Sequence, residues 1–172
     1  MNSTVNDIIS RRSIRRYKAQ QITDAELETV LHAGVCAPTG MNRQSPIIVA
    51  VQDKETINQL SRLNAHFMGV DTDPFYGAPT VLVVLAAAWS VHAVQDGSLV
   101  MGNLMNAAHA IGLGSCWINR AKESFETDEG KALLKRWGIE GEYIGVGNCI
   151  LGYPDEEPAM KPRKENYVYY VR

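Results

Sequence analysis

The chain has 172 residues, with 17 Lys and Arg against 19 Asp and Glu, a formal net charge of -2 and a pI near 6.1. This length suits one domain, or one protomer of an oligomer. The slightly acidic balance argues against a nucleic-acid partner, because such proteins carry a basic surface, and the 45% hydrophobic and 21% charged composition is that of an ordinary globular protein.

Membrane, secretion and metal signals are also missing from the sequence. The longest apolar run, residues 81–89, is far shorter than a membrane span, and the N-terminus has no signal-peptide pattern, so we expect a cytoplasmic protein without a membrane partner. Cys36, Cys116 and Cys149 are too far apart for a CxxC motif, and the four histidines form no HExxH pattern. We therefore expect no metal site.

Two helices are predicted before the first proline. Asn6 or Asp7 can cap a short helix that leads into residues 11–16, because a short polar side chain accepts hydrogen bonds from free helix amides. Farther along, Thr23 and Glu26 form a Thr-x-x-Glu capping box, which predicts a second helix from this point. This helix must end before the proline, since the residue preceding proline is disfavoured in helical conformation.

Strand and helix patterns alternate in the middle of the chain. Residues 47–51 predict a short strand, and residues 53–63 predict a helix. Glycines and prolines interrupt residues 64–79, which predicts an irregular segment and makes it a candidate mobile cover over a site. Residues 80–85 form a continuous apolar run, as expected of a central strand that is buried on both faces.

The second half begins with a helix predicted over residues 91–112, which has so little polar face that it should be buried in the core or at a subunit interface. A strand or extended loop is predicted over 115–118, a helix over 126–137, a strand over 143–151 and a terminal strand or arm over 167–171. The fold class is therefore α+β, with a small sheet whose strands are separated by helices.

Four arginines lie among residues 11–16 of a chain that is not basic overall, which indicates a local anion site. Guanidinium presents a planar fork of donors that suits phosphate, and it stays charged at any relevant pH. The alternation of the motif aims Arg11, Ser13 and Arg15 in the same direction. The alternative interpretation is a solvated basic turn.

A polar turn follows at residues 38–44, where Thr39, Asn42 and Gln44 place three polar side chains close together. Amide side chains both donate and accept hydrogen bonds, so they suit the edge of a heteroaromatic ring or a ribityl chain. The same turn could simply connect a helix to a strand.

The segment around Gly112 and Gly114 contains part of a dinucleotide-binding fingerprint, but it follows a helix instead of opening one, so that interpretation fails. Trp117 is more often a core residue than a wall against a flat ring. His109 is interpreted as a packed helix residue, and Cys116 has no His-Asp or His-Asn partners in a recognisable motif.

Together these segments resemble the FMN-dependent nitroreductase family, of which this would be a short, single-domain member. The matching segments are residues 11–15, 37–44, 77–79, 107–118, 151–154 and 161–163, in order over nearly the whole chain. The resemblance implies a nitroreductase-like fold, with a central, mostly antiparallel sheet flanked by helices. It also implies one FMN-binding domain over residues 1–172, a C-terminal arm over 163–172, and an intertwined homodimer with two FMN sites at its interface.

The resemblance further implies the residues that bind FMN. Those expected to hold the phosphate and ribityl chain are Arg11, Ser13, Arg15 and Arg163, with the backbone of Arg12 against the flavin. Those expected to cover the cofactor, in part from the partner subunit, are Pro38, Thr39, Gly40, Asn42 and Gln44. Those expected along the isoalloxazine, with backbone amides near its redox-active edge, are Cys116, Trp117 and Ile118.

The implied activity is two-step (ping-pong) transfer of electrons from NADH or NADPH through FMN to nitroaromatics, quinones or similar electron-poor substrates. Such chemistry belongs to the flavin and requires no catalytic side chain. One alternative is a flavin-binding or storage protein without turnover, in which Phe67, Phe75 and Tyr76 would plug the pocket. Another is a specialised flavin enzyme such as a reductive dehalogenase, and a nucleic-acid-binding module is the most distant.

Overall fold

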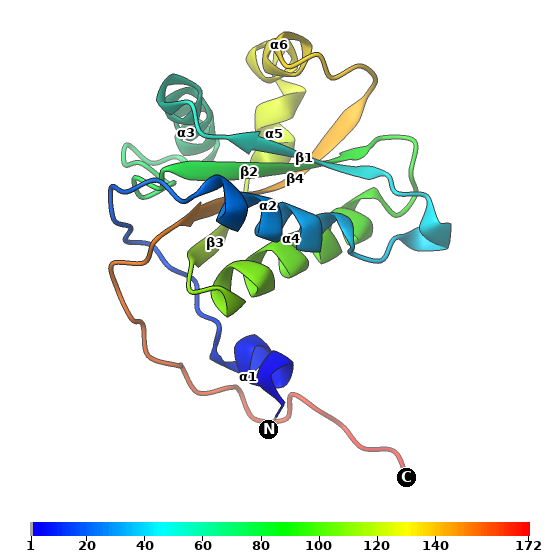
Figure 1. Ribbon diagram of the computed structural model, residues 1–172. Helices are drawn as coiled ribbons and strands as arrows, with labels where there is room; N and C mark the ends of the chain where they lie inside the picture. Colours follow the sequence, from blue (N-terminus) through cyan, green and yellow to red (C-terminus); the bar gives the residue numbers. More distant parts are fainter. Residues whose placement is uncertain (1) are drawn as a thin grey trace.

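A computed structural model describes residues 2–172 and contains a four-stranded sheet (Figure 1). The strands are β1 (Pro46–Val51), β2 (Thr80–Ala87), β3 (Gly114–Ile118) and β4 (Tyr143–Gly152), in the order β1-β2-β4-β3. Every neighbouring pair of these strands is antiparallel. The predicted α+β class with a mostly antiparallel sheet is therefore confirmed.

Helices cover both faces of this sheet. They are α1 (Ser3–Ser10), α2 (Asp24–Val35), α3 (Lys54–Met68), α4 (Ala93–Ala110), α5 (Ala121–Glu126) and α6 (Asp128–Arg136), with a short 3-10 turn, η1, at Gly40–Asn42. In Figure 1, α2 and α4 lie on one face and α3, α5 and α6 on the other, while α1 lies below the end of α4.

Strand β2 is the centre of both cores. All eight of its residues are buried, and successive side chains point to opposite faces of the sheet. Leu82 and Val84 pack with α2 and α4, whereas Val81 and Val83 pack with α3, α5 and α6. The prediction of a central strand that is buried on both faces is confirmed.

The first two helices begin at polar caps. The Thr23 hydroxyl accepts a hydrogen bond from the Glu26 amide while the Glu26 carboxylate accepts one from the Thr23 amide, so the predicted capping box is present. Helix α1, in contrast, starts earlier than predicted. Its cap is Asn2, whose side chain accepts from the Thr4 amide at 2.9 Å, and neither Asn6 nor Asp7 caps it.

The segment predicted to be irregular from residue 64 is shorter than expected. Helix α3 continues to Met68 and ends at Gly69, whose φ of +67° suits a residue without a side chain. Beyond it, the Asp73 carboxylate accepts hydrogen bonds from the Phe75 and Gly77 amides, and Phe75 is buried between the sheet and α3. These contacts tie the segment to the α3 side of the sheet.

The helix predicted over 126–137 is present as α6, whereas α5, directly before it, was not predicted. The two helices meet at Thr127, whose hydroxyl caps α6 by accepting from the Gly130 amide. Residues 167–171, for which a terminal strand or arm was predicted, do not form a strand. They are exposed and belong to the C-terminal tail, which leaves the body of the protomer in Figure 1.

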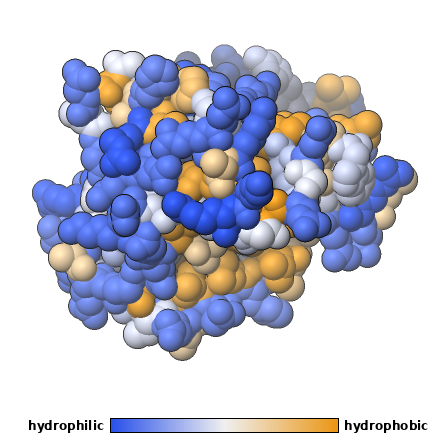
Figure 2. Space-filling model, turned by 90° about the horizontal axis from the view of Figure 1, so that it is seen from above, coloured by the Kyte–Doolittle hydropathy of each residue, from blue (hydrophilic) through white to orange (hydrophobic). Residues whose placement is uncertain are grey.

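Helix α4 is apolar on more than its core side. Val100 and Leu104 are buried against the sheet and α2, but Val94 and Leu99 are 53% and 48% exposed. Seen from above, from the side of α3 and α6, the surface is mostly hydrophilic, with hydrophobic residues in several places and the largest group in the lower middle of the view (Figure 2). The large exposed apolar side chains lie mainly in α1, at the start of α4 and in the tail, and none lies in α5 or α6.

Candidate functional site

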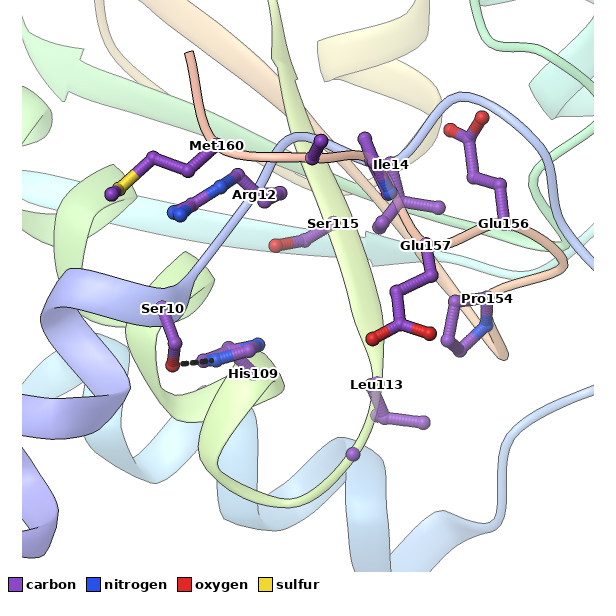
Figure 3. A pocket seen from close by; sticks show the side chains of 13 residues that line it. Ser10, Arg12, Ile14, His109, Leu113, Ser115, Pro154, Glu156, Glu157 and Met160 are labelled. Atoms are coloured by element: carbon purple, nitrogen blue, oxygen red, sulfur yellow. Dashed lines mark hydrogen bonds between the residues drawn. The ribbon is translucent and has the colours of Figure 1, made fainter. Parts of the chain in front are cut away.

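A pocket of about 660 Å³ lies where the N-terminal segment, the end of α4, the start of β3 and the segment after β4 meet (Figure 3). Its volume falls in the range typical of cofactor sites. The lining side chains on the N-terminal, α4 and β3 sides are Ser10, Arg12, Ile14, His109, Leu113 and Ser115. Pro154 and residues 156–160 line the opposite side.

The N-terminal segment runs along the outer edge of β3. Ser13 forms a parallel bridge with Ser115, and the Ile14 amide donates to the Ser115 carbonyl at 3.0 Å. Gly114 permits this approach, because a Cβ atom there would lie 3.0 Å from the Ile14 side chain. The arginine motif is thereby brought beside the predicted β3 residues.

The segment after β4 is fastened to the same part of the chain. The Lys18 amide donates to the Tyr153 carbonyl at 3.0 Å, and the Asp155 amide donates to the Arg16 carbonyl at 2.9 Å. The Arg15 amide donates to the Glu156 carboxylate. These bonds fix the segment after β4 in place, so that its residues line one side of the pocket.

Two buried polar atoms of the N-terminal segment and β3 have no hydrogen-bond partner within residues 2–172. One is the hydroxyl of Ser115, a pocket residue that is only 2% exposed. The other is Nη1 of Arg11, which is next to the pocket residues Ser10 and Arg12 in sequence but does not itself line the pocket. Figure 3 shows the Ser115 hydroxyl directed into the pocket. A buried polar group without a partner is unfavourable by about 1–3 kcal/mol, so each such atom needs a physical explanation. A ligand with oxygen atoms in this region would provide one.

Ser10, His109 and Ser115 are pocket residues that the sequence did not reveal. Ser10 Oγ and His109 Nε2 are 2.7 Å apart and join α1 to the end of α4. His109, predicted to be a packed helix residue, is partly exposed and lines the pocket. Ser115 could have been found from strand periodicity, since it lies two residues before Trp117 and therefore on the same face.

Titratable groups behind the pocket are neutral. Burial raises the pKa of Tyr17 well above its usual value, with smaller contributions from Cys116 and Cys149, and its hydroxyl donates to the Ile14 carbonyl at 2.7 Å. Burial, followed by the nearby Cys116, raises the pKa of the Cys149 thiol to about 12. Neither side chain is therefore an activated nucleophile at neutral pH.

The predicted β3 residues face in different directions. Cys116 and Ile118 are 2% and 6% exposed, and their side chains pack into the core beneath α5 and α6. Trp117 faces α4 and covers Gly147, where a Cβ atom would lie 2.5 Å from its indole nitrogen. None of Cys116, Trp117 and Ile118 is among the residues that line the pocket.

The polar turn lies elsewhere. In Figure 1 the loop that contains η1 is at the opposite end of α4 from the pocket, and Thr39 and Gln44 line a separate hollow of about 160 Å³. Near the start of α4, Asp96 contacts the loop, and near its end, His109 lines the pocket. The two residues are 109 − 96 = 13 positions apart in the helix. At 1.5 Å per residue these contacts are about 20 Å apart. The arginine motif and the polar turn are not brought together within one protomer.

The polar turn has an unusual backbone. Met41, Asn42 and Gln44 have φ values of +53°, +52° and +50°, in the left-handed region that non-glycine residues rarely adopt. The Gln44 amide donates to the Thr39 hydroxyl at 3.1 Å, and the Gln44 side chain donates to Asn42 at 3.2 Å. Such conformations cluster at ligand sites and persist where the surrounding structure holds them.

The remaining predicted residues are at the surface. Arg15 is exposed beside the pocket wall, and Arg163 lies in the exposed tail, three residues after Met160, which lines the pocket. Arg12 Nη1 donates to the Ile9 and Arg11 carbonyls at 2.8 and 2.7 Å, so it caps the end of α1.

Within residues 2–172, no three His, Cys, Asp or Glu side chains are grouped so that they could bind a metal ion. Within the same residues, no helix has both the length and the apolar character needed to cross a lipid bilayer.

Residues 8–157 match the model of the nitroreductase family. The chain is 29% identical to a Vibrio harveyi NADPH-flavin oxidoreductase, with 98% of this chain and 72% of that protein covered. It is 30% identical to a putative NADH dehydrogenase/NAD(P)H nitroreductase of Archaeoglobus fulgidus, with 91% and 88% covered. A Bacteroides fragilis nitroreductase solved with bound FMN superposes with a TM-score of 0.90 at 27% identity, and both chains are fully covered.

Proposed function

Because the chain belongs to the nitroreductase family, we propose that it is an FMN-dependent oxidoreductase that moves electrons from NADH or NADPH to nitroaromatics, quinones or similar electron-poor compounds. The reaction would follow a two-step (ping-pong) course, in which the oxidised nicotinamide leaves before the acceptor binds. It would take place in the cytoplasm, in a single FMN-binding domain over residues 1–172.

The observation that carries this proposal is the unpartnered, buried hydroxyl of Ser115 in the wall of a pocket of suitable volume, together with the unpartnered Nη1 of Arg11 in the adjoining N-terminal segment. FMN carries a phosphate dianion and a chain of hydroxyl groups, which match a guanidinium and a serine hydroxyl in charge and hydrogen bonding. The relatives named as flavin or FMN reductases, and the FMN bound to the Bacteroides fragilis structure, support the same cofactor.

The residues of this chain would bind and orient the cofactor. Those proposed to hold the phosphate and ribityl chain are Arg11, Ser13, Arg15, Arg163 and, as an addition, Ser115, with the Arg12 backbone against the flavin. The Ser115 carbonyl accepts a hydrogen bond from the Ile14 amide on the outer edge of β3. Because the peptide groups of alternate strand residues point to the same edge, those of Trp117 also point outward. The amide dipole of Trp117 there, on the stretch of β3 between Cys116 and Ile118, would stabilise negative charge at the ring edge.

FMN, when bound, supplies the redox chemistry by accepting a hydride from the nicotinamide and passing electrons to the acceptor. The protein would position both substrates and exclude water, and no side chain would be required to exchange a proton. This division of roles agrees with the neutral, buried state of Tyr17 and Cys149.

A homodimer would complete the site. The polar turn touches α4 about 20 Å from the part of α4 that lines the pocket, too far for the turn to reach the pocket of its own subunit. The turn would instead cover the cofactor of the partner subunit, through Pro38, Thr39, Gly40, Asn42 and Gln44. The exposed apolar side chains of α4 and of the tail at 163–172 would be buried between the two subunits.

Leu99→Glu is expected to break the dimer and with it FMN binding. Leu99 is 48% exposed on α4, so glutamate fits the isolated protomer, but a charge inside an apolar interface is strongly unfavourable. Sedimentation velocity should show a monomer, with helical circular dichroism retained. Ala132→Glu on the exposed surface of α6 is the control and should remain dimeric. A dimeric Leu99→Glu protein with normal FMN affinity would contradict this interface.

The function is tested by an absorbance spectrum of the purified protein before and after anaerobic addition of NADH or NADPH. We expect flavin bands that bleach with one of the nucleotides and recover on addition of a nitroaromatic or a quinone. Bands that do not bleach would instead support flavin storage. A protein that takes up no FMN would contradict the proposal.

The proposed plug of a storage protein lacks support among the described residues. Phe75 is 1% exposed and packs into the core on the α3 side of the sheet, and neither Phe67 nor Tyr76 lines the pocket. An iodotyrosine deiodinase is among the similar structures, but at 22% identity this likeness concerns the fold alone.

A further inference from the structure

Both ends of the polar turn are fastened to one buried carboxylate. Asp96 lies in the first turn of α4 and is 3% exposed. One carboxylate oxygen accepts from the Gly40 amide at 2.9 Å, and the other accepts from the Ser45 hydroxyl at 3.4 Å. We propose that Asp96 is a positioning residue, which holds this turn in the conformation that covers the partner subunit's FMN; the inference rests on the proposed function.

The backbone between these two hydrogen bonds has a conformation that non-glycine residues rarely adopt. Met41, Asn42 and Gln44, all with left-handed backbone, lie between Gly40 and Ser45. A segment with several such residues adopts this shape only if its ends are held. Asp96 therefore acts on Asn42 and Gln44, the two amide side chains proposed to contact the cofactor, without reaching the cofactor itself.

The start of α4 also sets how closely the turn can approach. A Cβ atom on Gly40 would lie 2.5 Å from the His92 ring, so a side chain there would displace either the ring or the turn at the point where Asp96 binds the backbone. The Asp96 amide donates to the His92 carbonyl at 2.8 Å, which places both residues on one helical turn. His92 and Asp96 together form the surface of α4 against which the turn packs.

Within residues 2–172, the carboxylate of Asp96 is not paired with a cation. Asp96 takes part in none of the ion pairs of 4 Å or less within the described chain. A buried carboxylate without a cation is unfavourable, and the free amides and dipole at the start of α4 offset this only in part. An apolar residue would serve the packing of α4 better, so the carboxylate is explained by the two donors of the turn.

The first experiment measures FMN affinity and thermal unfolding for three variants. Asp96→Ala is expected to weaken FMN binding by about tenfold or more, the consequence of losing a hydrogen bond to a charged group. Asp96→Asn should recover most of the affinity, because its oxygen still accepts from Gly40 and its amino group can donate to Ser45. Asp53→Ala, which removes an exposed cap of α3, is the control for lost stability and should bind FMN normally.

Gly40→Ala serves as a second route if Asp96→Ala does not fold. It displaces the turn from His92 while leaving the α4 carboxylate in place, and it should weaken FMN binding without changing the wild-type dimer. FMN affinity within about twofold of wild type in Asp96→Ala, or in Gly40→Ala if only that variant folds, would overturn the positioning role.

A heterodimer experiment tests whether the turn acts on the partner. One protomer carries Arg11→Ala and the other carries Asp96→Ala, prepared with two affinity tags. If the turn acts across the dimer, both changes fall on the same FMN site, and half of the sites bind with wild-type affinity. The matched heterodimer, with both changes on one protomer, should then have no wild-type site. The reverse pattern would show that the turn serves its own subunit and would overturn the inference.

FMN binding by the wild type and by the variants tests the proposed function and the role of Asp96 separately. If the wild-type protein takes up no FMN, the proposed function is wrong. If the wild type binds FMN and the Asp96 and Gly40 variants bind it equally well, the proposed function stands and the role of Asp96 is wrong.

Discussion

Arg11→Met is expected to weaken FMN binding by about 1.5–3 kcal/mol, the range for hydrogen bonds to charged groups. The same change should leave the FMN-free protein as stable as wild type, or more stable. The reason is that Arg11 Nη1 is buried without a partner in residues 2–172, so methionine removes an unsatisfied polar atom while keeping an unbranched side chain. A loss of affinity without a loss of stability is the signature of a group kept for a ligand.

The measurement is isothermal titration of the FMN-free protein, paired with thermal unfolding in the absence of FMN. Arg62→Met on the exposed surface of α3 is the matched control and should change neither quantity. A lower melting temperature for FMN-free Arg11→Met, or wild-type FMN affinity, would show that the Arg11 guanidinium is structural.

Gly145→Ala is expected to lower the free energy of unfolding by about 3 kcal/mol, the upper end of the usual penalty for overpacking. A Cβ atom on Gly145 would lie 2.3 Å from both the carbonyl carbon and the oxygen of Ala121. Backbone atoms cannot turn aside as a flexible side chain can. Helix α5 would therefore have to move away from β4.

Urea unfolding followed by circular dichroism measures this change. Ala50→Val is the control, because residue 50 is exposed on β1 of the same sheet and should change stability by no more than about 0.5 kcal/mol. A loss of less than about 1 kcal/mol would mean that α5 moves freely relative to the sheet.

Elements with a strong local signal were predicted well. The capping box of Thr23 and Glu26 locates the start of α2, and the continuous apolar run locates β2, because both depend on interactions close in sequence. Helix α5 was missed since it has only six residues, too few for a helical period to be visible. The start of α1 was misplaced because Asn2, Asn6 and Asp7 are all suitable caps, and the sequence does not choose among them.

The candidate site was predicted in part. The arginine motif and β3 do lie side by side at the pocket, joined by the bridge between Ser13 and Ser115. Ser115 and Asp96 were missed, since an isolated serine or a helical aspartate carries no signal until its surroundings are known. Ser115 matters because burial leaves its hydroxyl without a partner in residues 2–172. Asp96 matters because it binds Gly40, which lies 96 − 40 = 56 residues earlier in the chain.

The class of fold, the order of the main elements and the resemblance to a family could be predicted from the chain, because these follow from local periodicity, helix caps and short motifs. Three other properties became visible in the folded protein: Cys116 and Ile118 face the core, Arg11 Nη1 is buried without a partner in residues 2–172, and the polar turn lies at the far end of α4 from the pocket. These properties depend on contacts between residues distant in sequence. No local pattern encodes such distances or burial, and the packing of helices on the sheet creates them.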